Sequence, residues 1–283
     1  MTAIPAPAPA RPSGISVAVR RILDKYLLLV YTGIAVIYLM LPVALIVLFS
    51  FNDPAGKSNV VWQGFTVKYW LNPLGVAGLP SAVGLSLLIA FASTAIATVL
   101  GTLIALALVR YDFRGRKPAN ALIFLPMATP EIIMGASLLT MFVSIGGEPF
   151  FPLNVLTILI AHIMFNISFV VVTVRARLSG FPRHLEEAAM DLYANEVQTF
   201  WKVTFPLILP GIIAAGLLAF SLSIDDFVVT NFTSGNAQTF PMFIYAKNRI
   251  GVPVQVNVIG TIIFLVAVGS VLITTLNSRR KRP

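Results

Sequence analysis

Residues 27–49 read LLLVYTGIAVIYLMLPVALIVLF and contain no charged side chain. As an α-helix rising about 1.5 Å per residue, this run is about 35 Å long, which is enough to cross the roughly 30 Å hydrocarbon core of a bilayer. A backbone amide in lipid has to find its partner within the protein, so an isolated run of this kind has to be helical. The run therefore predicts an integral membrane protein built from helices.

The rest of the chain repeats this pattern. Hydrophobic residues make up 57% of the 283 positions and charged residues only 11%, whereas soluble domains carry about 25% charged residues. We expect an all-α membrane protein, because no alternating strand pattern is present. Six transmembrane helices are predicted: Leu27–Phe49, Val83–Val109, Ala119–Val143, Leu153–Val174, Leu207–Val229 and Val256–Leu276.

The basic residues predict the orientation of these spans. Sixteen of the twenty Lys and Arg residues lie in the two tails and in the loops after the second and fourth spans. Cytoplasmic loops accumulate Lys and Arg, so both termini and these two loops are predicted to be cytoplasmic. The formal net charge of +9 thus reflects topology, and nucleic-acid binding is not expected.

Three regions are predicted along the chain. Residues 1–25 begin with a Pro/Ala-rich stretch and are expected to be a disordered cytoplasmic tail. Residues 26–277 are expected to form the six-helix transmembrane domain, and residues 278–283 a basic cytoplasmic tail. The first span is predicted to stay as an anchor, because it lacks the features of a cleaved signal peptide.

Prolines fall within the third predicted span and at the start of the fifth. Pro126 and Pro130 lie within the third span, and Pro206 and Pro210 open the fifth. Proline removes a backbone donor, so we expect helix breaks at these points that pack against protein or line a water path.

Several kinds of chemistry are excluded by composition. The chain has no cysteine, and its two histidines, His162 and His184, are too few and too separated for a zinc site. Gly56-Lys57-Ser58 matches only the end of a phosphate-binding loop, because Phe51 stands where the first glycine is required. We therefore expect no ATPase site, no other enzymatic activity and no bound cofactor on this chain.

The longest polar insertion on the predicted cytoplasmic side is residues 175–206. Within it, Pro182–Tyr193 and Glu196–Val203 predict two short amphipathic helices, the second stopped by Pro206. Two short helices outside the membrane form a docking element, not an active site.

This loop resembles the cytoplasmic loop of the membrane subunits of ABC importers. That loop reads Glu-Ala-Ala, three residues, Gly, nine residues, Ile, one residue, Leu-Pro. Here residues 187–189 are Glu-Ala-Ala, Tyr193 stands at the Gly position, and Val203, Phe205 and Pro206 follow in register. The family's glycine supplies a left-handed turn, so we expect Asn195 to take that turn instead of Tyr193.

The resemblance implies the type I ABC importer (MetI-like) permease fold. It also implies that a helix of this loop sits in a groove of an ATPase subunit and transmits its closure to the spans. The residues that it assigns to this coupling are Arg183, Glu186, Glu187, Ala188, Ala189, Tyr193 and Pro206.

Three acidic residues in the spans are candidates for the path of the cargo. An Asp at a helix centre costs about 2.5–3.5 kcal/mol on insertion scales, and no Lys or Arg lies deep in a span to neutralise it. A flexible cation with several ammonium groups would be met by spaced carboxylates with aromatic faces between them. The predicted path residues are Asp225, Asp226, Glu131, Phe220, Phe227 and Tyr38.

Adjacent residues on a helix point about 100° apart. We therefore expect one of Asp225 and Asp226 to face the path and the other to cap the chain or bond Thr230 or Asn231. His162 is expected to be a hydrogen-bonded interior histidine.

Segments 160–178 and 220–235 resemble the polyamine branch of these permeases, the spermidine/putrescine importer subunits. This resemblance implies a sister permease, two ATPase subunits that use ATP and Mg, and an extracytoplasmic polyamine-binding protein. It also implies a multi-pass protein of the cytoplasmic (inner) membrane of a bacterium.

Two alternatives stay open. The cargo could be another small solute, although an oxyanion would favour Arg or helix N-termini over three acids. A proton-coupled secondary transporter could also use buried carboxylates, but it would usually show inverted repeats and no ATPase-docking loop.

Overall fold

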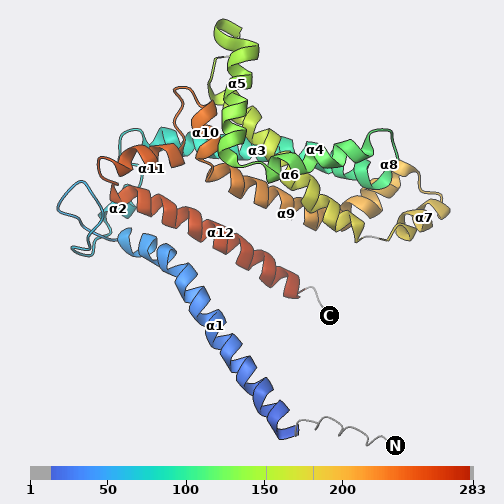
Figure 1. Cartoon of the computed structure of the whole chain (residues 1–283), viewed down its shortest axis with the longest axis horizontal. Helices are drawn as coiled ribbons and strands as arrows, with labels where there is room; N and C mark the ends of the chain where they lie inside the picture. Colours follow the sequence, from blue (N-terminus) through green and yellow to red (C-terminus); the bar gives the residue numbers. More distant parts are fainter. Residues whose placement is uncertain (1–13, 151, 181, 281–283) are drawn as a thin grey trace, which may run out of the picture. The chain divides into compact units, whose positions relative to one another are not determined.

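The computed structural model describes residues 14–150, 152–180 and 182–280 (Figure 1). Within these ranges the regular elements are helices. The chain divides into unit 1, residues 1–73 with 253–283, and unit 2, residues 74–252.

Unit 1 contains α1 (Gly14–Phe49), α2 (Lys68–Leu71) and α12 (Val254–Arg280). Helix α1 already begins at Gly14, where the sequence predicts an irregular tail; the first thirteen residues of that tail lie outside the described residues. The assignment of the tail stays a prediction.

Helices α1 and α12 contact each other at Gly260, where an added Cβ would lie 3.5 Å from a methyl carbon of Ile46.

The loop from residue 50 to residue 67 is a folded element organised around Asn52. The Asn52 amide donates to the side-chain oxygen of Asn59, at 2.7 Å, and to the Val61 carbonyl, at 2.8 Å. Its own oxygen accepts from the Gln63 backbone N–H at 2.8 Å. These bonds satisfy a fully buried amide and fix the loop.

Three long helices form the core of unit 2: α3 (Leu79–Arg110), α6 (Val155–Ser179) and α9 (Phe205–Ile224). A buried cluster joins them, comprising Ala97, Ala105, Leu108, Val170, Val171, Val174, Ala215 and Ala219. A Cβ added at Gly101 would lie 2.6 Å from Val170 Cγ1. The small residues of α3 therefore bring α6 into close contact with its backbone.

The third predicted span is broken. Helices α4 (Arg116–Ala128) and α5 (Glu131–Phe150) meet at an angle of 109°. Pro130 lacks a backbone N–H and holds Thr129 in an extended conformation, which ends α4. The predicted break at Pro130 is confirmed.

The predicted breaks at Pro126 and Pro210 are wrong, because α4 and α9 run through them. Each proline removes one backbone hydrogen bond without ending its helix. The fifth span also ends earlier than predicted: α9 stops at Ile224, and the short α10 (Val228–Thr233) follows.

The segment between α6 and α9 contains the two predicted short helices. Helix α7 spans His184–Asp191, and α8 (Glu196–Thr199) leads through a π-helical turn, η1 (Phe200–Thr204), directly into α9. The prediction that Pro206 stops the second helix is wrong. Pro206 lies in the first turn of α9, where a missing N–H is tolerated, and helix continues through it.

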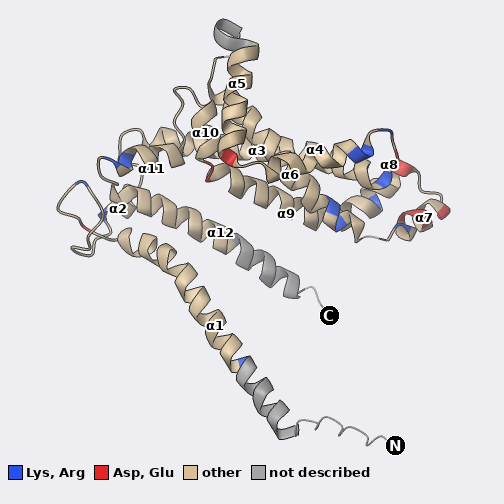
Figure 2. Ribbon diagram, in the orientation of Figure 1, with Lys and Arg blue, Asp and Glu red and all other residues tan. Residues whose placement is uncertain are grey.

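Four helical segments among the described residues are long and apolar enough to span a membrane: residues 25–49, 79–110, 155–179 and 196–224. The bent α4–α5 pair makes a fifth, whereas the described apolar part of α12, Val254–Gly269, is shorter. Within unit 2, Figure 2 shows Lys and Arg gathering at the end where α4, α7 and α8 lie. The sixth span and the cytoplasmic termini stay predictions.

Candidate functional site

A cavity of about 600 Å³ lies in unit 2 where several helices are interrupted. Its wall consists of residues 126–131 at the α4–α5 bend and residues 225–229 between α9 and α10, with Met134, Phe165, Phe169 and Leu222. Because the chain leaves and re-enters helix at both places, side chains of the breaks are presented to a common space.

The cavity brings together the three predicted acidic residues. Glu131 comes from the bend after Pro130, and Asp225 and Asp226 follow the end of α9. Among the residues of the wall, none is Lys or Arg. The wall thus combines three acidic residues with no Lys or Arg among its own residues.

The predicted aromatic residues separate into three cases. Phe227 lies in the wall of the cavity. Phe220 packs against Phe91, with ring centroids 4.8 Å apart, and is not part of the wall. Tyr38 belongs to unit 1, so its place in the path stays a prediction.

Phe165 and Phe169 are wall residues that the predicted path did not include. They are four residues apart in α6, and this spacing puts both rings on one face of the helix. That spacing was the signal available in the sequence.

Asp226 is held by the start of α10. Its carboxylate accepts hydrogen bonds from the Thr230 backbone N–H at 2.8 Å, the Thr230 hydroxyl at 2.7 Å and the Val229 N–H at 3.3 Å. The side chain is 7% exposed. The expectation that one of the two aspartates bonds Thr230 is confirmed for Asp226.

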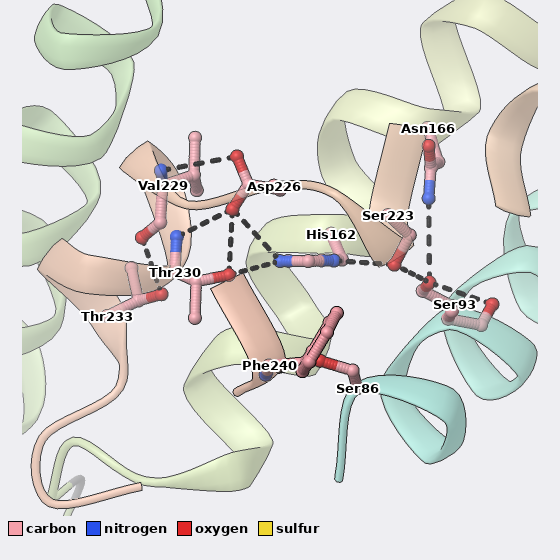
Figure 3. Close-up of polar contacts among 11 residues, drawn as sticks. Ser86, Ser93, His162, Asn166, Ser223, Asp226, Val229, Thr230, Thr233 and Phe240 are labelled. Carbon is pink, nitrogen blue, oxygen red and sulfur yellow. Dashed lines mark hydrogen bonds and ion pairs between the residues drawn. The ribbon is translucent and has the colours of Figure 1, made fainter. Parts of the chain in front are cut away.

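Asp226 is also the end of a buried chain of polar side chains (Figure 3). His162 Nε2 lies 2.9 Å from Thr230 Oγ1 and 3.4 Å from the Asp226 carboxylate, and Nδ1 lies 2.6 Å from Ser223 Oγ. Ser223 in turn contacts Ser93 at 3.1 Å. His162 is therefore a hydrogen-bonded interior histidine, as predicted.

From Ser223 onward, the hydrogen bonds in this row of side chains all run in one direction, toward Asp226. Thr230 donates its hydroxyl hydrogen to Asp226, so its oxygen is left to accept from His162 Nε2–H. With a neutral imidazole, Nδ1 then accepts from the Ser223 hydroxyl. The chain links α3, α6, α9 and α10 and ends on the carboxylate.

Asp225 differs from its neighbour. Among the described residues, no side chain makes a hydrogen bond or ion pair with the carboxylate of Asp225 or with that of Glu131. Asp225 lies at the end of α9 and Asp226 in the connection to α10. The premise that the two aspartates lie on one helix was wrong, because helix ends at Ile224.

The residues assigned to coupling lie on and beside α7, except Pro206, which lies in the first turn of α9. Glu187 and Arg183 are exposed, with a closest contact of 4.0 Å, and Ala188 is exposed next to the partly buried Ala189. Glu186 points inward and contacts Arg110 at 2.9 Å.

The turn after α7 is made by Tyr193 itself. Its φ is +62°, in the left-handed region, and the residue is 98% exposed. Asn195 was expected to take this turn, but it is extended and caps α8, accepting from the Gln198 N–H at 2.8 Å. That expectation was wrong, because the side chain of Asn195 is needed for the cap.

Comparison with known families and proteins is consistent with this arrangement. The family described as "Binding-protein-dependent transport system inner membrane component" matches residues 97–282. The chain is 40% identical over 238 residues to the putrescine transport system permease protein PotI of Escherichia coli (strain K12), covering 83% of this chain and 84% of PotI. It is 37% identical over 245 residues to the spermidine/putrescine transport system permease protein PotC of the same strain, covering 86% of this chain and 90% of PotC.

The fold also matches a solved structure. A chain of a bacterial ABC transporter involved in the import of the acidic polysaccharide alginate superposes with a TM-score of 0.70 at 17% identity. The match covers 95% of this chain and 99% of that chain. At this identity the likeness supports the shared permease fold.

Proposed function

The chain belongs to the family of inner-membrane components of binding-protein-dependent transport systems, and on this basis we propose that it forms part of a polyamine path. It is homologous to permease subunits of polyamine ABC importers and is not itself an enzyme. The observation that carries the proposal is the cavity in which Glu131 and Asp225 face a common space without a basic neighbour in the wall.

The chemistry of the wall suits a chain of ammonium groups separated by methylenes. Carboxylates attract and hydrogen-bond ammonium groups, and the rings of Phe165, Phe169 and Phe227 offer apolar surface and cation–π contact. An anion would be repelled by the same wall. The names of two relatives, a putrescine and a spermidine/putrescine permease, agree with such a cargo.

The proposed assembly has six spans in this subunit, with the bent α4–α5 pair as the third and α12 as the sixth. Both termini lie in the cytoplasm and the protein is in the inner membrane. A second, similar permease completes the path, two ATPase subunits supply energy from ATP and Mg, and an extracytoplasmic protein delivers the cargo.

The proposed ATPase contact is the surface around α7 and the turn that follows it. Leu192, Tyr193, Val197 and Trp201 are exposed there, beside the charged Arg183 and Glu187. Exposed apolar side chains next to charges are typical of a protein interface.

Uptake of radiolabelled putrescine and spermidine by the complete transporter in liposomes tests the cargo. We expect Asp225→Asn and Glu131→Gln each to raise KM about tenfold, because each variant loses one hydrogen bond to a charged group and a factor of ten corresponds to about 1.4 kcal/mol. Asp112→Asn is the matched control, because that carboxylate is 92% exposed and outside the cavity. An unchanged KM in the double variant contradicts the proposed path, and uptake driven by a proton gradient without ATP contradicts the proposed energy source.

A further inference from the structure

A cluster of three side chains joins the ends of separate elements in unit 2. Arg110 Nη2 lies 2.9 Å from Glu186 Oε1, and the Thr204 hydroxyl donates to the same oxygen at 2.7 Å. The side chains of Arg110 and Glu186 are 15% and 13% exposed, and Thr204 is buried. This cluster, called the Glu186 cluster below, is distinct from the cavity.

Each member of the Glu186 cluster stands at the end of its element. Arg110 is the last residue of α3, where a cation is favoured by the helix dipole. Glu186 is in the first turn of α7, where an anion is favoured. Thr204 is the last residue of the π-helical turn that opens into α9.

The neighbouring glutamate behaves differently. The side chain of Glu187 is 59% exposed and lies 4.0 Å from Arg183, on its own segment. Exposed ion pairs contribute little to stability and exchange partners readily, whereas a partly buried ion pair with further hydrogen bonds keeps one geometry. Of the two adjacent glutamates, therefore, Glu186 is the one that ties α7 to other elements among the described residues of unit 2.

We propose that Glu186 is a positioning residue that joins α7 to α3 and α9 at once, so that a displacement of α7 moves both spans together. The proposal rests on the ATP-driven importer assignment, not on the identity of the cargo. It gives Glu186 an internal role, in place of the contact with an ATPase subunit that the family motif suggests for this segment.

The two spans that meet the Glu186 cluster also meet near the cavity. Ser93 of α3 and Ser223 of α9 are 3.1 Å apart. Ser223 contacts His162, which reaches Asp226 in the cavity wall. A shift of α3 and α9 relative to α6 therefore has a hydrogen-bonded route to the wall of the cavity.

The test measures cargo transported per ATP hydrolysed by the complete transporter in liposomes. We expect Glu186→Gln and Arg110→Gln to assemble with all partner subunits and to hydrolyse ATP, but to transport about tenfold less cargo per ATP. The variant that carries both changes is expected to be no worse than either alone, and Arg110→Lys is expected to retain coupling. Asp112→Asn, which breaks the exposed pair with Arg116 in the same region, is the control.

A second measurement does not depend on the cargo. The chain has no cysteine, so Val228→Cys places a single thiol in the wall of the cavity. We expect nucleotide binding to change the rate at which this introduced thiol reacts with a thiol reagent in an otherwise unchanged chain. We expect that change to disappear in the presence of Glu186→Gln.

The proposal would be overturned by an unchanged transport ratio in Glu186→Gln, or by a nucleotide response of the introduced thiol that persists in this variant. Loss of the ATPase subunits from the purified Glu186→Gln complex would overturn it as well, since it indicates a docking role. A wild-type complex that imports no polyamine refutes the proposed cargo, while the thiol measurement still decides the role of Glu186.

Discussion

Replacing Asp226 by asparagine is expected to loosen α10 more than it weakens cargo binding. The carboxylate accepts from Thr230 N–H, the Thr230 hydroxyl and Val229 N–H. Asparagine has the same shape as aspartate, but its amide NH₂ group replaces one acceptor oxygen by a donor that faces the donors of Val229 and Thr230. Hydrogen bonds to a charged group contribute about 1.5–3 kcal/mol, so we expect α10 to lose about 2 kcal/mol.

Hydrogen exchange of residues 228–233 in the assembled transporter measures this loss. Since about 1.4 kcal/mol corresponds to a factor of ten, exchange in α10 should accelerate about 30-fold. Asp225→Asn is the matched control, because no side chain of the described residues bonds that carboxylate, and it should leave exchange in α10 unchanged. If Asp226→Asn instead raises KM as Asp225→Asn does and leaves α10 protected, the structural assignment of Asp226 is refuted.

Three further predictions concern packing, a turn and the docking surface. Gly101→Ala should destabilise the subunit by about 1–3 kcal/mol, because the added methyl group overpacks against Val170. Gly84→Ala is the control: its methyl group meets open space in the same helix, so this variant should raise the melting temperature of the subunit. Equal melting temperatures of the two variants would contradict the close contact of α3 and α6. Tyr193→Gly should stabilise the subunit by about 0.5–1 kcal/mol through relief of left-handed strain, and a lowered melting temperature would count against that strain. Glu187→Arg should uncouple transport from ATP hydrolysis, and wild-type stimulation of the ATPase by loaded binding protein would exclude a docking role for this residue.

Most of the helices could be predicted from the apolar runs, because a membrane demands length and apolarity and both are visible in sequence. The break at Pro130 was equally visible, since proline cannot donate and constrains the residue before it. The angle of 109° was not, because it depends on what α4 and α5 pack against.

The end of α9 was missed because apolar residues continue past the aspartates to Val229. A signal was present: Asp226 precedes a short apolar run and caps it through the Val229 and Thr230 N–H groups, as an N-terminal helix cap does. Reading that signal would have placed the two aspartates in a connection between helices.

The sequence alone does not predict which of the adjacent residues Glu186 and Glu187 points inward. Glu186 and Glu187 occupy one helical turn, and the choice of the inward one depends on Arg110 at the end of α3 and Thr204 before α9. Both partners are distant in sequence. The left-handed Tyr193 is a similar case, because Asn195 is the better candidate until its use as a cap is known.

The interruptions at the cavity have an electrostatic consequence of their own. Helices α4 and α9 end there, at Ala128 and Ile224, and the carbonyl groups of a last helical turn lack a donor within the helix and carry partial negative charge. Helices α5 and α10 begin at the same cavity, at Glu131 and Val228, and the N–H groups of a first helical turn carry partial positive charge. The main chain thus presents charge of both signs to the cavity, so the sign of the cargo has to be selected by the side chains of the wall, and a change of cargo can proceed by side-chain substitution without straightening the bends.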